Sequence, residues 1–157
     1  MTNCRTAVAN GKMCFKKQLI GKKCFEQLRK IQEIKLRWFQ IRILHRILTT
    51  NIVLKEMGVT ESNKCSQCNN EKDSILHGLW ECQISKTFWN YFLEFIHAHC
   101  ANVRNLTLND KIIIFGTDNT FKGDKLFDYI LLCAKVYLHQ CKSEKTIPKL
   151  AVFRKKD

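Results

Sequence analysis

The chain has 157 residues, enough for one domain with a hydrophobic core, or for one domain with an arm. Hydrophobic residues make up 45% of it, which argues against a chain that is disordered throughout. Its net charge of +13 favours a polyanionic partner such as nucleic acid.

The positive charge is unevenly distributed. Residues 1–58 carry 13 Lys and Arg against 3 Asp and Glu, and residues 99–157 carry 11 against 6. The middle segment, 59–98, has 3 against 5, so we expect the anion-binding surface to lie outside it. The nine cysteines are an odd number, which favours reduced thiols in an intracellular protein over a disulfide scaffold. The nucleus and the cytoplasm are not distinguished.

The N-terminal third is predicted to be a basic arm followed by a helix. Residues 1–22 form the arm, and residues 23–48 show a helical period without Gly or Pro. One predicted apolar stripe of this segment consists of Trp38, Ile41, Leu44 and Leu48. Three cations spaced by seven and four residues share another face, and they either bind phosphate or form an ordinary solvated surface: Lys35, Arg42 and Arg46.

A short helix over 52–57 should follow. Thr49, Thr50 and Asn51 supply an N-cap, and Gly58 is placed to end the helix in the left-handed conformation.

The segment 65–82 contains four soft metal ligands. Cys65, Cys68, His77 and Cys82 are separated by two, eight and four residues, the arrangement of a closed tetrahedral zinc site. Two residues between the first two cysteines allow a tight turn that brings both sulfurs to one ion. Because protein side chains fill all four positions, we predict one structural Zn²⁺ and no catalytic metal. The alternative is a group of reduced, buried cysteines.

Helices are also predicted after these ligands. Asp73 or Ser74 can cap a short helix through Trp80. A longer helix starts at Gln83 or Ser85 and buries Phe88, Phe92, Phe95 and Ile96, with Trp89 adjoining. The aromatic residues form either a hydrophobic shell around the metal or a base-stacking platform. Residues 111–115 are either a short helix or a brief strand.

A final helix begins after Asp124 and has a wide apolar stripe. Its members are Phe127, Ile130, Leu131, Ala134, Tyr137, Leu138 and Cys141. Lys135, His139 and Lys142 form a second basic row at spacings of four and three, from which we expect Lys135 and Lys142 to contact phosphates. Residues 146–157 are expected to be a solvated basic tail.

These elements predict a mainly α fold, a small helical domain built around the Cys-Cys-His-Cys zinc knuckle with a basic N-terminal arm. The predicted parts are the arm 1–22, the zinc-binding helical domain 23–100, a helical extension 101–145 that packs on it, and the tail 146–157. No apolar run approaches the roughly 20 residues that cross a bilayer, so no membrane partner is expected.

Several motifs together resemble a known family. The run 35–51, KLRWFQIRILHRILTTN, is followed by Leu54, by the four ligands and by Phe88-Trp89. This combination resembles the zinc-binding domain that follows the polymerase in reverse transcriptases of non-LTR (LINE-type) retrotransposons, over roughly residues 35–150. The resemblance implies that the chain is the C-terminal part of such a polyprotein.

The resemblance also implies a role in holding template RNA or target DNA. Phosphate contacts are expected from Lys35, Arg37, Arg42 and Arg46, with Lys135 and Lys142 in addition. The chain has no Asp-Asp pair to hold the metal ions of a polymerase, so we predict no enzyme activity. Two alternatives stay open: a module that docks on other proteins such as a reverse transcriptase core, and a decayed fragment without selected function.

Overall fold

The computed structural model describes residues 32–100, 103, 105–117 and 125–155. Every regular element assigned in these ranges is a helix, and no strand is assigned there. The prediction of a mainly helical fold is therefore confirmed. In chain order the helices are α2 (Ile34–Leu44), α3 (Asn51–Glu56), the π-helical turn η1 (His77–Glu81), α4 (Gln83–His99), α5 (Asp110–Phe115), α6 (Lys125–Ser143) and α7 (Leu150–Phe153). The predicted arm, residues 23–31 and Asp124 lie outside the described residues.

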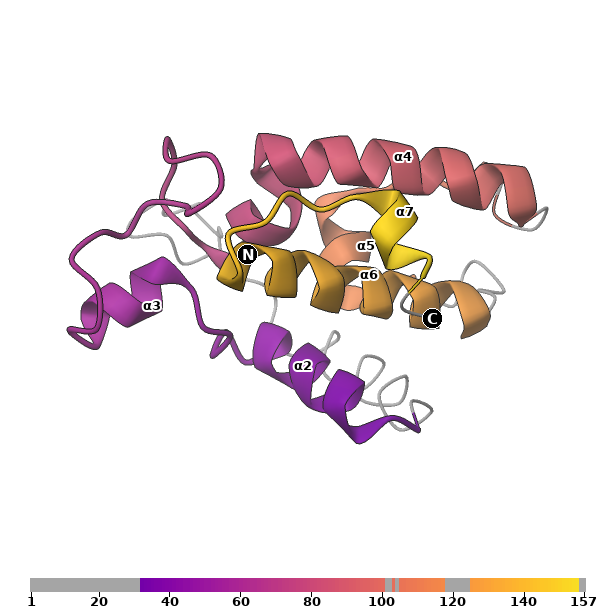
Figure 1. The fold of residues 1–157 in the computed structure, drawn as a ribbon. Coiled ribbons are helices and arrows are strands. Elements are labelled where there is room, and N and C mark those ends of the chain that lie inside the picture. The colour runs from indigo at the N-terminus through magenta and orange to yellow at the C-terminus, as the bar shows by residue number, and fades with distance from the viewer. Residues whose placement is uncertain (1–31, 101–102, 104, 118–124, 156–157) are drawn as a thin grey trace, which may run out of the picture.

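Helices α4 and α6 are the two long elements of the fold, and they run in opposite directions (Figure 1). α2 packs along the side of α6 that faces away from α4, and α3 lies beyond the end of α2 (Figure 1). The predicted apolar stripes of α4 and α6 are confirmed, since both helices bury them in one continuous core. The two faces meet because each carries apolar residues at helical spacing.

An aromatic cluster lies at the centre of this core. The ring of Phe88 lies 5.5 Å from that of Trp89, 5.7 Å from that of Tyr137 and 6.0 Å from that of Phe153, measured between centroids. These separations are typical of favourable ring pairs. Phe153 is 5% exposed and belongs to α7, so the segment expected to be a solvated tail contributes to the core instead.

Helix α2 ends earlier than predicted. His45 is its C-cap, Arg46 has a φ of 60°, and the Ile47 amide donates to the Arg42 carbonyl oxygen. This is a Schellman motif with an arginine in the left-handed position that glycine usually takes. The helix therefore ends at Leu44, although neither Gly nor Pro follows it in the sequence.

The predicted apolar stripe is wrong for the residues of α2 itself, although Leu48, beyond the helix end, is buried as expected at 2% exposed. The buried residues are Leu36, Phe39, Gln40 and Ile43, at helical spacing. Trp38, which was expected in the core, is 58% exposed. The Gln40 amide donates to the Ile114 carbonyl oxygen at 2.7 Å, so the polar residue on the buried face is satisfied by α5.

The short helices follow their capping signals. Thr50 caps α3, and Gly58 adopts a φ of 71° just beyond its end, as predicted. Residues 110–115 form a helix and not a strand, because Asn109 accepts the Ile112 amide as its N-cap. Gly116, with a φ of 86°, ends that helix.

Candidate metal centre

The first two ligands lie on a tight turn. The Asn69 amide donates to the Cys65 carbonyl oxygen at 2.9 Å, and the Cys65 amide donates to the Glu71 carbonyl oxygen at 2.8 Å. Asn69 has a φ of 57°, a conformation that Asn adopts more readily than most residues. The turn reverses the chain and brings the sulfur atoms of Cys65 and Cys68 together.

The other two ligands are positioned by the π-helical turn η1. The Ser74 hydroxyl accepts the His77 amide at 2.9 Å and so satisfies the first amide of the turn. The Cys82 amide donates to the His77 carbonyl oxygen, five residues back. Residues five apart in an α-helix project about 140° apart, and the wider π turn reduces that angle. It therefore brings His77 and Cys82 toward the same side.

The four predicted ligands converge. Their ligand atoms all lie within 4.8 Å of one another, and this is the one group with metal-ligand composition and geometry among the described residues. The Cys65 and Cys82 sulfurs are 4.0 Å apart, and the Cys68 sulfur lies 3.3 Å from His77 Nε2. A tetrahedral zinc ion with bonds of about 2.0–2.3 Å needs ligand atoms about 3.5–3.8 Å apart. The donor set and its spacing fit zinc.

Backbone amides stabilise the negative charge on Cys68. Burial alone would raise the pKa of this thiol, but the amides of Glu71 and Asn70, together with His77, outweigh burial and lower the pKa to about 6. Burial and the neighbouring Cys65 raise the pKa of Cys82 to about 11. Crowded thiolates repel one another, so a divalent cation among them would stabilise all three.

A buried ion pair links this centre to the C-terminal end of α6. The Lys142 ammonium contacts the carboxylate of Asp73, a side chain that is 1% exposed. The same carboxylate accepts the Asn51 amide at 2.8 Å, at the start of α3. Gly78 leaves the room for this pair, because a Cβ there would lie 2.6 Å from Lys142 Nζ. Asp73 therefore joins three segments that are distant in sequence.

The aromatic core is attached to the same turn. The Trp89 indole donates to the Leu79 carbonyl oxygen at 2.6 Å, and the Ser85 hydroxyl donates to the Gly78 carbonyl oxygen at 2.7 Å. These bonds satisfy carbonyl groups of the π turn that lie in a buried environment. The first residues of α4 thus fix the segment that carries His77 and Cys82.

Comparison with known proteins identifies this arrangement. A family model described as zinc-binding in reverse transcriptase matches residues 8–89, more than half of the chain. The chain belongs to this family. No curated protein and no solved structure matches it. The match confirms the family resemblance for residues 35–89 and includes all four ligands, whereas residues 90–150, to which the resemblance was expected to extend, lie outside it. The match also includes residues 8–22 of the predicted arm, and no catalytic reverse transcriptase domain was detected.

The second basic row, predicted on the helix that is now α6, is not exposed as expected. Lys135 is 2% exposed and donates to the side-chain oxygen of Gln40 on α2. Lys142 is 9% exposed and pairs with Asp73. Both ammonium groups are bound to side chains inside the fold and do not form a phosphate-binding surface. Nothing in the local sequence signalled this, because the partners lie 95 and 69 residues away.

The basic residues of α2 are placed differently. Lys35 and Arg42 are exposed on the outer side of the helix, and Arg37 is half-buried. Arg46 is also exposed, but it lies beyond the end of α2 in its left-handed conformation. The predicted row is therefore bent at its C-terminal end. Asp73 and Gly78, which support the metal centre, were not identified from the sequence as functional residues.

No helix in the described ranges combines the length and the hydropathy that a membrane-spanning segment requires.

Proposed function

We propose that this chain is a non-catalytic module that binds RNA or DNA through phosphate contacts and keeps its fold with one structural zinc ion. In the reverse transcriptase of a non-LTR retrotransposon, such a module would hold the RNA template or the target DNA. Cys65, Cys68, His77 and Cys82 would fill all four positions around the ion. A closed site of this kind contributes folding free energy and leaves no position for substrate.

The outer side of α2 supports the nucleic-acid part of the proposal. This helix contains the cations Lys35, Arg37 and Arg42 and no carboxylate. Lys35 and Arg42 are exposed there, and Arg46 extends the charge past the helix end. We call Lys35, Arg42 and Arg46 together the α2 basic face. A surface with one sign of charge attracts phosphates and releases their counterions.

The test is binding of fluorescein-labelled RNA and duplex DNA, measured by fluorescence anisotropy between about 50 and 200 mM salt. The affinity should fall steeply with salt and depend little on sequence. The logarithm of the binding constant falls linearly with the logarithm of the salt concentration. Replacing all three residues of the α2 basic face by alanine should reduce the magnitude of that slope by about two to three. Circular dichroism should show unchanged helicity, because the three side chains are exposed.

The matched control replaces three exposed lysines on α4 and near α7, Lys86, Lys149 and Lys155, by alanine. It removes the same charge from segments outside α2 and should lose much less affinity. Equal losses in both triple variants would show that only net charge matters. Affinity that does not change with salt would refute the proposal.

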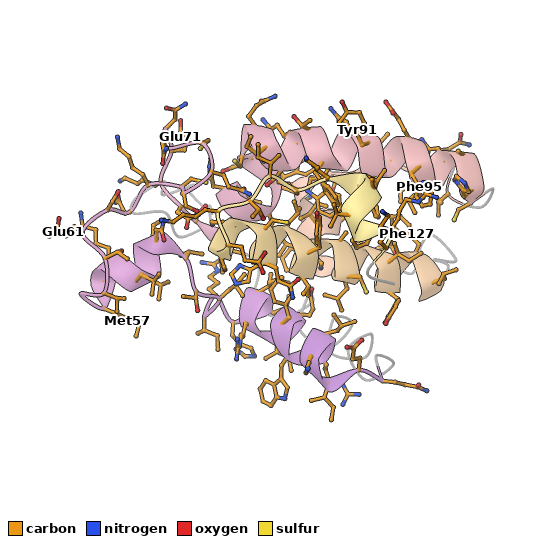
Figure 2. The ribbon with its side chains drawn as sticks, viewed as in Figure 1. Met57, Glu61, Glu71, Tyr91, Phe95 and Phe127 are labelled. Atoms are coloured by element: carbon orange, nitrogen blue, oxygen red, sulfur yellow. The ribbon has the colours of Figure 1, made fainter. Side chains whose placement is uncertain are left out.

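A second candidate function is docking on another protein, such as the reverse transcriptase core. Three large apolar side chains near α3 are exposed: Ile47, Met57 and Val59. Figure 2 shows Met57 at the edge of the fold that α3 forms. Exposed apolar surface of this kind favours association that is insensitive to salt. Met57→Glu should abolish such association in light scattering, and Tyr91→Glu on α4 should leave it intact.

A further inference from the structure

Trp38 does not belong to the hydrophobic core of the described residues. Its side chain is 58% exposed, whereas Trp89 is 1% exposed and hydrogen-bonded in the core. At 100° per residue, Trp38 projects almost opposite the buried face of α2. An exposed indole of this size is apolar surface left in water, and a ligand would cover it.

The surroundings of Trp38 indicate the kind of ligand. Lys35 lies three residues before it and Arg42 four residues after it, so both are its neighbours on the helix surface. Both cations are exposed, and α2 contains no carboxylate. The indole is thus flanked along the helix by an ammonium and a guanidinium group. The other two neighbours of Trp38 at this spacing are apolar: Ile34, which is 65% exposed, and Ile41, which is half-buried. The two cations therefore lie on one side of the indole, where a phosphate can approach it.

We infer that Trp38 stacks on an unpaired base while Lys35 and Arg42 bind the adjacent phosphates, so that the preferred ligand is single-stranded nucleic acid. The inference rests on the proposed function and adds the ligand class. Every base presents a flat face to an aromatic ring once it is unpaired, whereas bases in a duplex are already stacked on one another. The combination of a basic track and an aromatic side chain is typical of single-strand binding.

The experiment compares two DNA strands of equal length and charge. One is a thymidine 12-mer, and the other has the same backbone with tetrahydrofuran in place of every base. The wild-type chain should bind the strand with bases at least about fivefold more tightly, since one stacked base contributes about 1–3 kcal/mol. Trp38→Ala should bind both strands equally, and Trp38→Phe should give an intermediate ratio.

Tyr91→Ala is the matched control. Figure 2 shows Tyr91 pointing outward from α4, on the side of the molecule away from α2, and this ring is also exposed. It removes an exposed aromatic ring without touching the α2 basic face. The ratio between the two strands should stay at its wild-type value.

The outcomes separate this inference from the proposed function. Equal binding of both strands by the wild-type chain, with steep salt dependence, would overturn the stacking inference alone. An unchanged ratio in Trp38→Ala would also overturn it. No binding of either strand would overturn both proposals. Association of the chain with a protein partner that Trp38→Ala abolishes, with strand affinities unchanged, would assign Trp38 to protein docking instead.

Discussion

Replacing Lys142 by methionine tests the buried ion pair that joins the metal centre to α6. The variant keeps the apolar stem but removes the charge that faces Asp73. The carboxylate is 1% exposed and would retain only the Asn51 amide as a partner. An uncompensated charge in this position is strongly destabilising.

The expected loss in the free energy of unfolding is about 3 kcal/mol, the lower end of the range for broken buried pairs, because the Lys142 side chain is still 10% exposed. In a chain of this size each kcal/mol corresponds to about 2–4 °C in Tm, so Tm should fall by about 6–12 °C. The double variant Asp73→Asn/Lys142→Met should recover much of this loss, because it leaves no buried charge without a partner.

Urea unfolding followed by far-UV circular dichroism measures these differences in the zinc-loaded chain. Lys86→Met, the same change at an exposed position of α4, should stay within about 0.5 kcal/mol of wild type. A loss below about 1 kcal/mol in Lys142→Met would refute the reasoning. So would a double variant whose loss equals the sum of the two single losses.

Three further predictions follow from the site and its surroundings. Cys68→Ser should unfold the central region and release the metal, checked by circular dichroism and native mass spectrometry; Cys100→Ser, outside the ligand set, should not. Burial and the charges of Lys142 and Arg42, partly offset by Asp73, lower the pKa of His139 below its ordinary 6.5. The unfolded chain then binds more protons than the folded chain just below pH 6.5, so the free energy of unfolding should decrease there as the pH falls. In urea titrations, His139→Gln should show a smaller decrease than wild type. Lys145 has a φ of 53°, so Lys145→Gly should raise the free energy of unfolding by about 0.5 kcal/mol; a lower Tm would contradict this.

The metal centre was largely predictable because its determinants are local. The spacing of Cys65, Cys68, His77 and Cys82 identifies the ligand set without knowledge of the fold. The π turn that brings His77 and Cys82 together was not predictable. It depends on carbonyl groups being satisfied by Ser85 and Trp89, which belong to the next helix.

The two long helices were predictable for a similar reason. The apolar stripes of α4 and α6 are strong enough to identify the buried face from one segment alone. In α2 both sides carry large apolar residues, so periodicity cannot say which side is covered. Contact with α5 and α6 decides in favour of Phe39 and leaves Trp38 in water.

The sequence by itself determined the helical class, the caps of α3, the metal ligands and the family. Only the tertiary structure decided which basic side chains are buried and which are exposed. Lys135 and Lys142 resemble surface residues in any local window, but each has a hydrogen-bond acceptor on a distant segment: the neutral amide oxygen of Gln40 for Lys135 and the carboxylate of Asp73 for Lys142. A charged side chain can be buried only where such a partner is supplied, and that partner is brought there by the packing of whole helices.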